Sequence, residues 1–295
     1  VEKNFFNGLP GSNNQILVVK IDDSNPAHPQ IGVEDADLVY VEQVEGGITR
    51  LAAIYTSKLP PLIGPVRSAR ISDLEILSQF GRVGFAYSGA QSKMRPVIAA
   101  ANLENLSAER NPPSIYGKDP NRPGPVNMIL KPDLLLDRAN SNPKIRIDTA
   151  TTSPFIFGEQ PAALTMTSSV KVKWPSARYE FRWDLESSKW LIYFNDKPKL
   201  AASGLHLYAD TAIIQLVSIQ PSIYGDKFGE ITPLSKTTGS GKAILLRDGF
   251  AYQIDWKRNL ESDVTSWRDA DGKDVKFKPG KTWILLTDKQ PVLTP

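Results

Sequence analysis

Short apolar runs separated by turn-forming residues dominate the first half of the chain. Residues Ile16 to Asp22 form one such run, and residues 37–56 contain two more that flank Gly46-Gly47. Runs of this length predict buried β-strands, and a glycine pair between two of them predicts a β-hairpin. Residues 82–89 predict a further strand in the same way.

Helical spacing of apolar residues occurs between and after these strands. Residues 72–81 show this spacing and end in glycine, which predicts a helix. Residues 91–103 predict another helix, in which Pro96 is tolerated only within the first turn. Residues 132–140 predict a short helix that starts at a proline. Strands and helices in alternation indicate a mixed sheet layered with helices.

From about Ile145 the pattern changes to short, alternating, aromatic-rich runs with turn signals between them. These runs are residues 170–195, 210–219, 242–258 and 281–288. They predict a β-rich second domain, in which we expect Trp256, Trp267 and Trp283 to pack.

The length and the change of pattern together predict an α+β protein of two domains. Residues 1–150 would form an N-terminal domain with a mixed β-sheet and helices. Residues 151–295 would form a smaller β-rich C-terminal domain.

Composition narrows the possible chemistry. The formal net charge is only +3 and the basic residues are dispersed, so we expect no nucleic-acid partner. No apolar run approaches the roughly 20 residues of a membrane-spanning helix. The chain has no cysteine, and its two histidines are far apart, so we expect no metal and no cofactor.

The predicted hairpin carries charged residues close to its turn. A two-residue turn would pair Glu45 with Ile48 and Gln43 with Arg50, which puts Gln43, Glu45 and Arg50 on one face and Glu42 on the other. A Glu–Arg contact on this face is either a structural ion pair or part of a binding site.

Arg67-Ser68-Ala69-Arg70 precedes a predicted helix that can begin near Ser68 or at Ser72-Asp73. If it begins near Ser68, backbone N–H groups, a hydroxyl and two guanidiniums converge and form an anion site. Alternatively, the arginines pair inside the protein with Glu42, Glu45 or Asp73. Arginine suits both roles, so the residues leave both open.

Other segments carry weaker signals. Ser88 ends a predicted strand, where ligands often bind, but its surroundings lack the flanking glycines of a hydrolase nucleophile. Residues 237–243 resemble a phosphate loop only superficially and predict a glycine turn. Asp22 and Asp23 could bind a metal ion with Glu42 or Glu45, although the spacing is not that of a calcium loop.

Residues 110–130, rich in proline and glycine, predict an ordered functional surface loop rather than regular elements. Its polar candidates are Tyr116, Asp119, Arg122 and Asn127. We expect this loop to cover the charged residues of the hairpin and helix.

Four long strings make the chain resemble the YerB-like bacterial lipoproteins, a family of unknown function. They are ADLVYVEQVEGGITRLAAIY (Ala36 to Tyr55), IGPVRSAR (Ile63 to Arg70), VVKIDDSNPAHPQIG near the start, and GSGKAILLRDGFAYQIDWKR towards the end. The resemblance implies a two-domain α+β protein. It also implies an extracytoplasmic, cell-envelope location with a lipid anchor on a cysteine outside this sequence.

Three functions remain open. The first is a binding protein for an envelope ligand, anionic or polyhydroxylated, or for a protein partner. Its expected ligand-binding residues are Glu42, Glu45, Arg50, Arg67, Ser68, Arg70, Ser88, Tyr116, Arg122 and Asn127. The second is a structural or interaction module whose signature residues form an internal salt-bridge network. The third is a cell-wall glycan hydrolase or transferase that uses Glu42 and Glu45, or Glu45 and Asp22, as acid and base.

Overall fold

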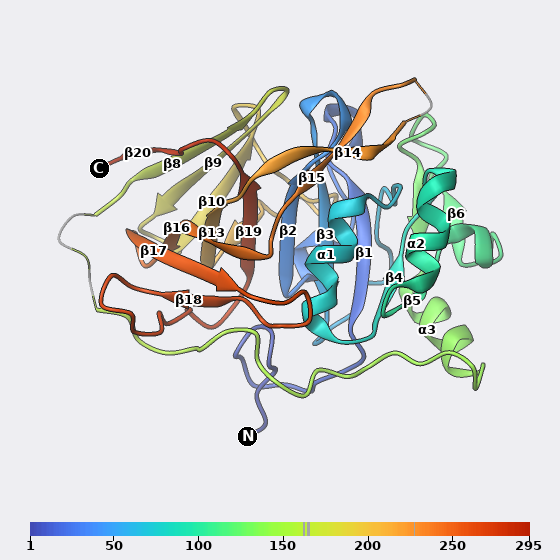
Figure 1. Ribbon diagram of the computed structural model, residues 1–295, viewed down its shortest axis with the longest axis horizontal. Helices are drawn as coiled ribbons and strands as arrows, with labels where there is room; N and C mark the ends of the chain where they lie inside the picture. Colours follow the sequence, from blue (N-terminus) through green and yellow to red (C-terminus); the bar gives the residue numbers. More distant parts are fainter. Residues whose placement is uncertain (162, 164–165, 227) are drawn as a thin grey trace.

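The four strands predicted in the first half, and a short fifth strand that was not predicted, belong to one large sheet in the computed structural model, which describes residues 1–295 except 162, 164–165 and 227 (Figure 1). The strands are β1 (Leu17–Asp22), β2 (Leu38–Gln43), β3 (Thr49–Tyr55), β4 (Val83–Ala86) and β5 (Leu103–Asn105). β1–β3 and β2–β3 are antiparallel, whereas β1–β4 and β4–β5 are parallel. The predicted mixed sheet is therefore confirmed.

Strands of the second half extend this sheet without a break. They are β13 (Thr211–Leu216), β16 (Gly239–Arg247), β17 (Phe250–Arg258), β18 (Ser266–Arg268) and β19 (Thr282–Thr287). The ten-stranded sheet has the order β18-β17-β16-β13-β19-β2-β3-β1-β4-β5. β19 pairs in parallel with β2 on one side and with β13 on the other, so it joins the two halves of the chain.

A second, antiparallel sheet covers one face of the large sheet, on the left in Figure 1. Its strands are β8 (Ser169–Trp174), β9 (Ala177–Asp184), β10 (Lys189–Phe194), β11 (Lys197–Pro198), β12 (Tyr208–Ala209) and β20 (Val292–Thr294). Aromatic side chains such as Trp174, Tyr179 and Trp190 fill the interface between the two sheets.

Helices cover the other end of the molecule. They are α1 (Ile71–Leu77), α2 (Arg95–Ala100) and α3 (Pro132–Asn140). α1 and α2 pack on one face of the large sheet, and α3 packs on the opposite face. Short 3-10 helices complete the description: η1 (Asn25–Ala27), η2 (Val33–Asp35), η3 (Glu45–Gly47), η4 (Ser78–Phe80), η5 (Ser92–Met94) and η6 (Ala108–Arg110).

A two-stranded arm, β14 (Ile219–Gly225) and β15 (Ile231–Ser235), crosses α1 (Figure 1). Hydrogen bonds hold its base to the helix, and in the first of them the Ser235 N–H donates to the Ser72 hydroxyl oxygen at 2.9 Å. Glu75 accepts the backbone N–H groups of Thr237 and Thr238 at 2.8 and 2.7 Å. The arm therefore lies against the charged end of α1.

These features confirm the α+β fold class, with a mixed sheet and three helices in the N-terminal part and mostly antiparallel strands in the C-terminal part. Trp256, Trp267 and Trp283 are buried, as predicted. Gly239 and Gly241 lie within β16, so residues 237–243 do not precede a helix, and the predicted glycine turn is replaced by the start of a strand. The boundary near residue 150 stays a prediction.

The hairpin at Gly46-Gly47 is present, but its predicted register is wrong by one residue. Glu42, and not Gln43, lies opposite Arg50. The turn takes three residues instead of two, because Glu45–Gly47 form η3, with φ of 68° at both glycines. Glu42 and Arg50 therefore share one face of the sheet, where we expected opposite faces.

Of the two helix starts expected from the sequence, the one near Ser68 is not observed. α1 begins at Ile71, and the Asp73 carboxylate accepts the Arg70 N–H at 2.6 Å. Residues 67–69 are extended instead: the Arg67 N–H donates to the Lys20 carbonyl, and the Arg67 carbonyl accepts the Ser88 N–H. Ser68 therefore does not cap a helix.

Residues 110–130 are more regular than predicted. They contain a short antiparallel hairpin of β6 (Tyr116–Lys118) and β7 (Met128–Leu130). Tyr116 belongs to the hydrophobic core beneath it.

Candidate functional site

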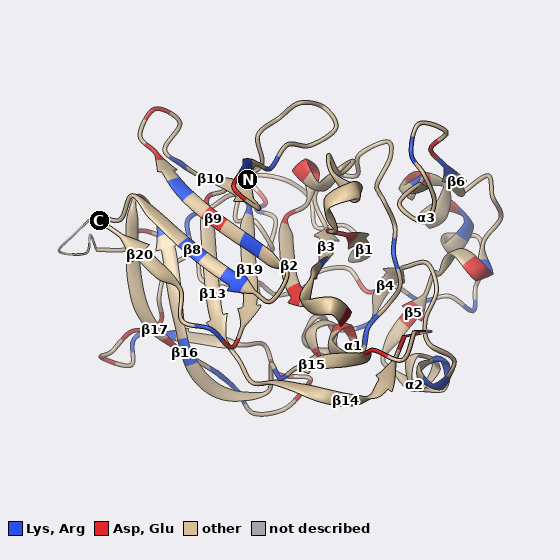
Figure 2. Cartoon of the chain, turned by 90° about the horizontal axis from the view of Figure 1, so that it is seen from above, with Lys and Arg blue, Asp and Glu red and all other residues tan. Residues whose placement is uncertain are grey.

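One group of charged side chains lies where β1, β2 and β3 end beside the start of α1. Arg50 on β3 lies opposite Asp22 on one side and opposite Glu42 on the other. Directly opposite residues point to the same face of a sheet, so these side chains converge. We call the whole group the acid–arginine cluster: Lys20, Asp22, Glu42, Glu45, Arg50, Arg67, Arg70 and Asp73. Acidic and basic segments meet beside α1 in Figure 2.

A fully buried trio forms the floor of the cluster. The Lys20 ammonium contacts Glu42 and lies 2.7 Å from Asp73, and all three side chains have 0% exposure. Burial raises the pKa of Glu42 to about 7, the Asp73 carboxylate adds to the rise, and the Lys20 ammonium opposes it. One ammonium thus serves two buried carboxyls, and one Glu42 oxygen has no hydrogen-bond partner among the described residues.

Two ion pairs form the rim of the cluster. Arg67 Nε donates to Asp22 at 2.7 Å, and Arg70 Nε donates to Glu45 at 2.8 Å. The Thr232 hydroxyl of the arm donates to the other Glu45 oxygen. Burial alone would raise the pKa of Glu45, but the Arg70 guanidinium and the Thr232 hydroxyl lower it below its usual value.

Arg50 lies between the floor and the rim. Its side chain donates to the Ser68 carbonyl at 3.1 Å, but its buried Nε has no partner among the described residues. Burial lowers the pKa of Arg50 to about 10, and the neighbouring Arg70 contributes. An unpaired buried guanidinium N–H is costly, so the site would gain from an acceptor placed there.

The rim is open to solvent on the side of Arg67, whose side chain is 28% exposed. Ser68 and Ser88 are half-buried beside it, and a Cβ at Gly89 would lie 3.2 Å from the Ser68 hydroxyl. Guanidiniums, hydroxyls and a close backbone approach are the groups that bind an anion. The structure therefore brings together seven of the predicted ligand residues: Glu42, Glu45, Arg50, Arg67, Ser68, Arg70 and Ser88.

The other three predicted ligand residues lie elsewhere. The Tyr116 hydroxyl donates to the Leu106 carbonyl inside the core. Arg122 pairs with Asp119 and donates to the carbonyls of Ala27 and Pro29. Asn127 belongs to the same loop, where its carbonyl accepts the Asp119 N–H. These contacts tie the loop to residues 25–29.

The carboxylates proposed for acid–base chemistry are buried or paired. Glu42 has 0% exposure, and the side chains of Asp22 and Glu45 are 3% and 7% exposed and held by arginines. Glycoside hydrolysis needs two carboxyls that face an open cleft. This geometry gives the glycan-hydrolase hypothesis no support.

Sequence reasoning missed the roles of Lys20 and of the neighbouring Asp23. Asp23 points to the opposite face of the sheet, where Lys199, Thr49 and Tyr179 bind its carboxylate, each at 2.6 Å. Asp22 and Asp23 therefore do not share a site. The signal for Lys20 was present, because a lysine inside the apolar run LVVKID needs a buried partner.

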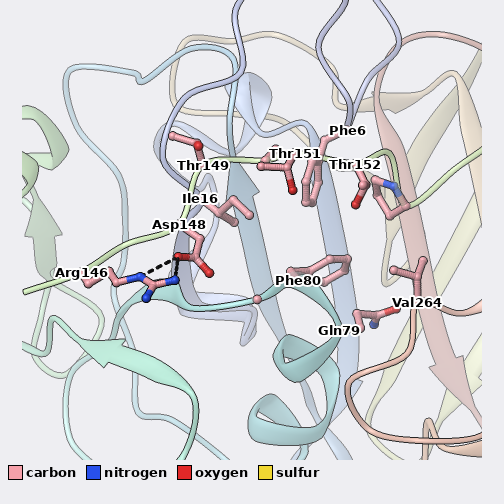
Figure 3. Close-up of a pocket in the computed structure, with 13 residues that line it drawn as sticks. Phe6, Ile16, Gln79, Phe80, Arg146, Asp148, Thr149, Thr151, Thr152 and Val264 are labelled. Atoms are coloured by element: carbon pink, nitrogen blue, oxygen red, sulfur yellow. Dashed lines mark hydrogen bonds and ion pairs between the residues drawn. The ribbon is translucent and has the colours of Figure 1, made fainter.

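Five cavities lined by described residues lie away from Arg67 and Arg70. The cavity in Figure 3, of about 380 Å³, is near the opposite end of β1, beside Ile16, Phe80 and the Arg146–Asp148 ion pair. Arg67 and Arg70 line none of these cavities.

Comparison with known proteins places the chain among its relatives. Residues 8–146 match the N-terminal domain of a family described as protein of unknown function (DUF3048), and residues 170–284 match its C-terminal domain. The chain belongs to this family. The family resemblance predicted from the sequence is confirmed.

The sequence and the structure of one relative agree with this assignment. The chain is 23% identical over 276 residues to "Putative lipoprotein YerB" of Bacillus subtilis (strain 168), which covers 92% of this chain and 80% of the relative. A crystal structure of the YerB protein from Bacillus subtilis matches 100% of both chains with a TM-score of 0.84 and 22% identity. At this identity the structural similarity shows the shared fold.

Within the described residues, no helix has the length and apolar character required to cross a membrane.

Proposed function

We propose that the protein is an extracytoplasmic cell-envelope protein that binds an anionic ligand at the rim of the acid–arginine cluster. The observation that carries this proposal is Arg50, a buried arginine whose Nε has no partner within the described part of the chain, close to the partly exposed guanidinium of Arg67. A phosphate or carboxylate at this point would accept from both side chains.

The energetics of the cluster also support a function. Buried ion pairs contribute little net stability, and apolar replacements of similar volume are often neutral or stabilising. Here three ionisable side chains have 0% exposure, and Glu42 and Arg50 each keep a polar atom with no partner among the described residues. Sites that break the rules of packing in this way are often functional.

The envelope location is part of the proposal and rests on the relative named a lipoprotein. We infer that the anchor lies outside this sequence, which contains no cysteine. An anionic ligand is a reasonable partner there, because phosphate and carboxylate groups are the anions that arginine forks recognise best.

A structural module is the second candidate. It is favoured by one observation: Arg67 and Arg70 each already have a carboxylate partner. In this case the cluster would only hold the hairpin, α1 and the arm together. The two candidates differ in whether an added anion contacts the arginines.

Calorimetric titration with inorganic phosphate and with glycerol 1-phosphate tests the proposed function. We expect saturable binding, weakened about tenfold or more by Arg67→Gln, since a hydrogen bond to a charged group contributes roughly 1.5–3 kcal/mol. Arg178→Gln is the matched control, because Arg178 forms an exposed ion pair with Asp196. Equal binding by wild type and both variants would contradict the anion site.

A further inference from the structure

A candidate second site lies at the seam between the regions that match the two family domains, apart from the acid–arginine cluster. It is a cavity of about 680 Å³ between residues 25–29 of the N-terminal domain and residues 194–204 of the C-terminal domain. Ligand sites have volumes of roughly 300–1,000 Å³ and occur often at domain interfaces. The size and position of this cavity are therefore those of a small-molecule site.

Its walls are mainly apolar. Phe194, Pro29, Pro198 and Leu200 line it, and the Leu200 side chain remains 42% exposed although it borders a cavity. The His28 ring stacks on Phe194 with 4.5 Å between ring centroids, which adds a flat surface. Such a wall accommodates an aliphatic or aromatic body.

The charged groups around this cavity are basic. His28, Lys197 and Lys199 line it, and no Asp or Glu is found among its described lining residues. Lys197 is exposed at the mouth. An apolar cavity with basic groups at its border complements a molecule with an apolar body and a negative group.

A buried charge pair lies behind the stacked rings. The Lys199 ammonium has 0% exposure, lies 2.6 Å from Asp23, and donates to His28 Nε2 at 2.7 Å. His28 Nδ1 then donates to the Ser24 carbonyl at 2.9 Å. Burial lowers the pKa of Lys199, while the Asp23 carboxylate opposes this and already pairs with the ammonium. Lys197, exposed at the mouth, is therefore the basic group that a ligand would reach.

The wall on the side of the N-terminal domain is held in place before any ligand binds. Arg122 donates to the carbonyls of Ala27 and Pro29, on both sides of His28. On the other side, the Ala202 N–H donates to the Gln30 carbonyl at 2.7 Å. A preformed cavity binds its ligand with a smaller entropic cost.

We propose that this seam cavity binds a small amphipathic anion, with its apolar body against Phe194 and Leu200 and its carboxylate or sulfonate-like group near Lys197. The site is independent of the anion site at the acid–arginine cluster. It shares no residue with that cluster, so either proposal can fail alone.

Fluorescence titration with 8-anilino-1-naphthalenesulfonate, an amphipathic anion, tests the proposal. We expect a saturable increase in fluorescence that decanoate reverses and that 1-decanol reverses about tenfold less effectively. Leu200→Gln and Lys197→Gln should each weaken dye binding about five- to tenfold. Both residues are exposed on the edge strand β11 or just after it, so folding should be retained, which circular dichroism checks.

Matched controls are Leu185→Gln and Lys242→Gln, whose side chains are exposed and do not line the cavity. Dye binding unchanged in these controls and weakened in the cavity variants supports the site. Equal affinities in all four variants would overturn it, because the dye would then bind elsewhere. Equal displacement by decanoate and 1-decanol would overturn the requirement for an anion.

Discussion

At the scale of single residues, the charge balance around Lys20 determines the chemistry of the cluster. Lys20 lies between Glu42 and Asp73 with none of the three exposed, so one positive charge faces two carboxyls. The pKa of Glu42 rises to about 7, first because of burial and then because of Asp73. The carboxyl of Glu42 is therefore partly protonated at neutral pH.

We expect Glu42→Gln to change how stability depends on pH. A carboxyl whose pKa is higher in the folded state stabilises the fold fully below its unfolded value of about 4.5, and this contribution is lost as the pH rises through about 7. The unfolding free energy of wild type should therefore fall relative to Glu42→Gln by on the order of 3 kcal/mol from about pH 4.5 to about pH 8. Urea denaturation at several pH values measures this difference.

Glu104→Gln serves as the control for that experiment, because Glu104 forms a partly exposed ion pair with Arg82. Its stability should follow the pH profile of wild type closely, since exposed pairs contribute little. If the unfolding free energy of Glu42→Gln changed with pH in parallel with that of wild type, Glu42 would not have the raised pKa.

At the scale of elements, the strands and helices could be predicted from periodicity, but the register of the hairpin could not. β2 and β3 are buried on both faces, so no polar face distinguishes one register from the other. The turn decides instead, and η3 uses three residues with both glycines at positive φ. Because the observed register differs by one residue from the predicted one, Glu42 lies opposite Arg50, and both side chains belong to the cluster.

The start of α1 could not be predicted uniquely either. Ser68, Ser72 and Asp73 are all acceptable capping residues, and the choice depends on contacts distant in sequence. Residues 67–69 are held by Lys20 and by residues 88–89, which stops the helix from starting earlier. The partners of Arg67 and Arg70 follow from this arrangement. The core role of Tyr116 depends in the same way on the short β6–β7 hairpin.

At the scale of the whole molecule, the large sheet joins the regions that match the two family domains. β19 pairs with β2 through four residue pairs, from Thr282–Leu38 to Leu285–Val41, and all of these strands are buried. Breaking this contact would expose the unpaired backbone of two central strands. The two regions should therefore depend on each other for stability.

We expect the two regions to unfold in one transition. All six tryptophans lie within residues 174–283, so tryptophan fluorescence reports only on the C-terminal region. A dye on Leu134→Cys, at an exposed position of α3, reports on the N-terminal region, and the chain has no other cysteine. The two probes should give the same urea midpoint. Two separate midpoints would show that the regions unfold independently.

The central claim is that an anion contacts Arg50 and Arg67 at the rim of the acid–arginine cluster. The most direct test is to follow the Nε–H resonances of the arginine side chains by NMR while glycerol 1-phosphate is added. We predict saturable shifts for Arg50, whose Nε has no partner among the described residues, and for Arg67, with no shift for the distant Arg178. Unchanged Arg50 and Arg67 resonances, or shifts no larger than that of Arg178, would contradict the account.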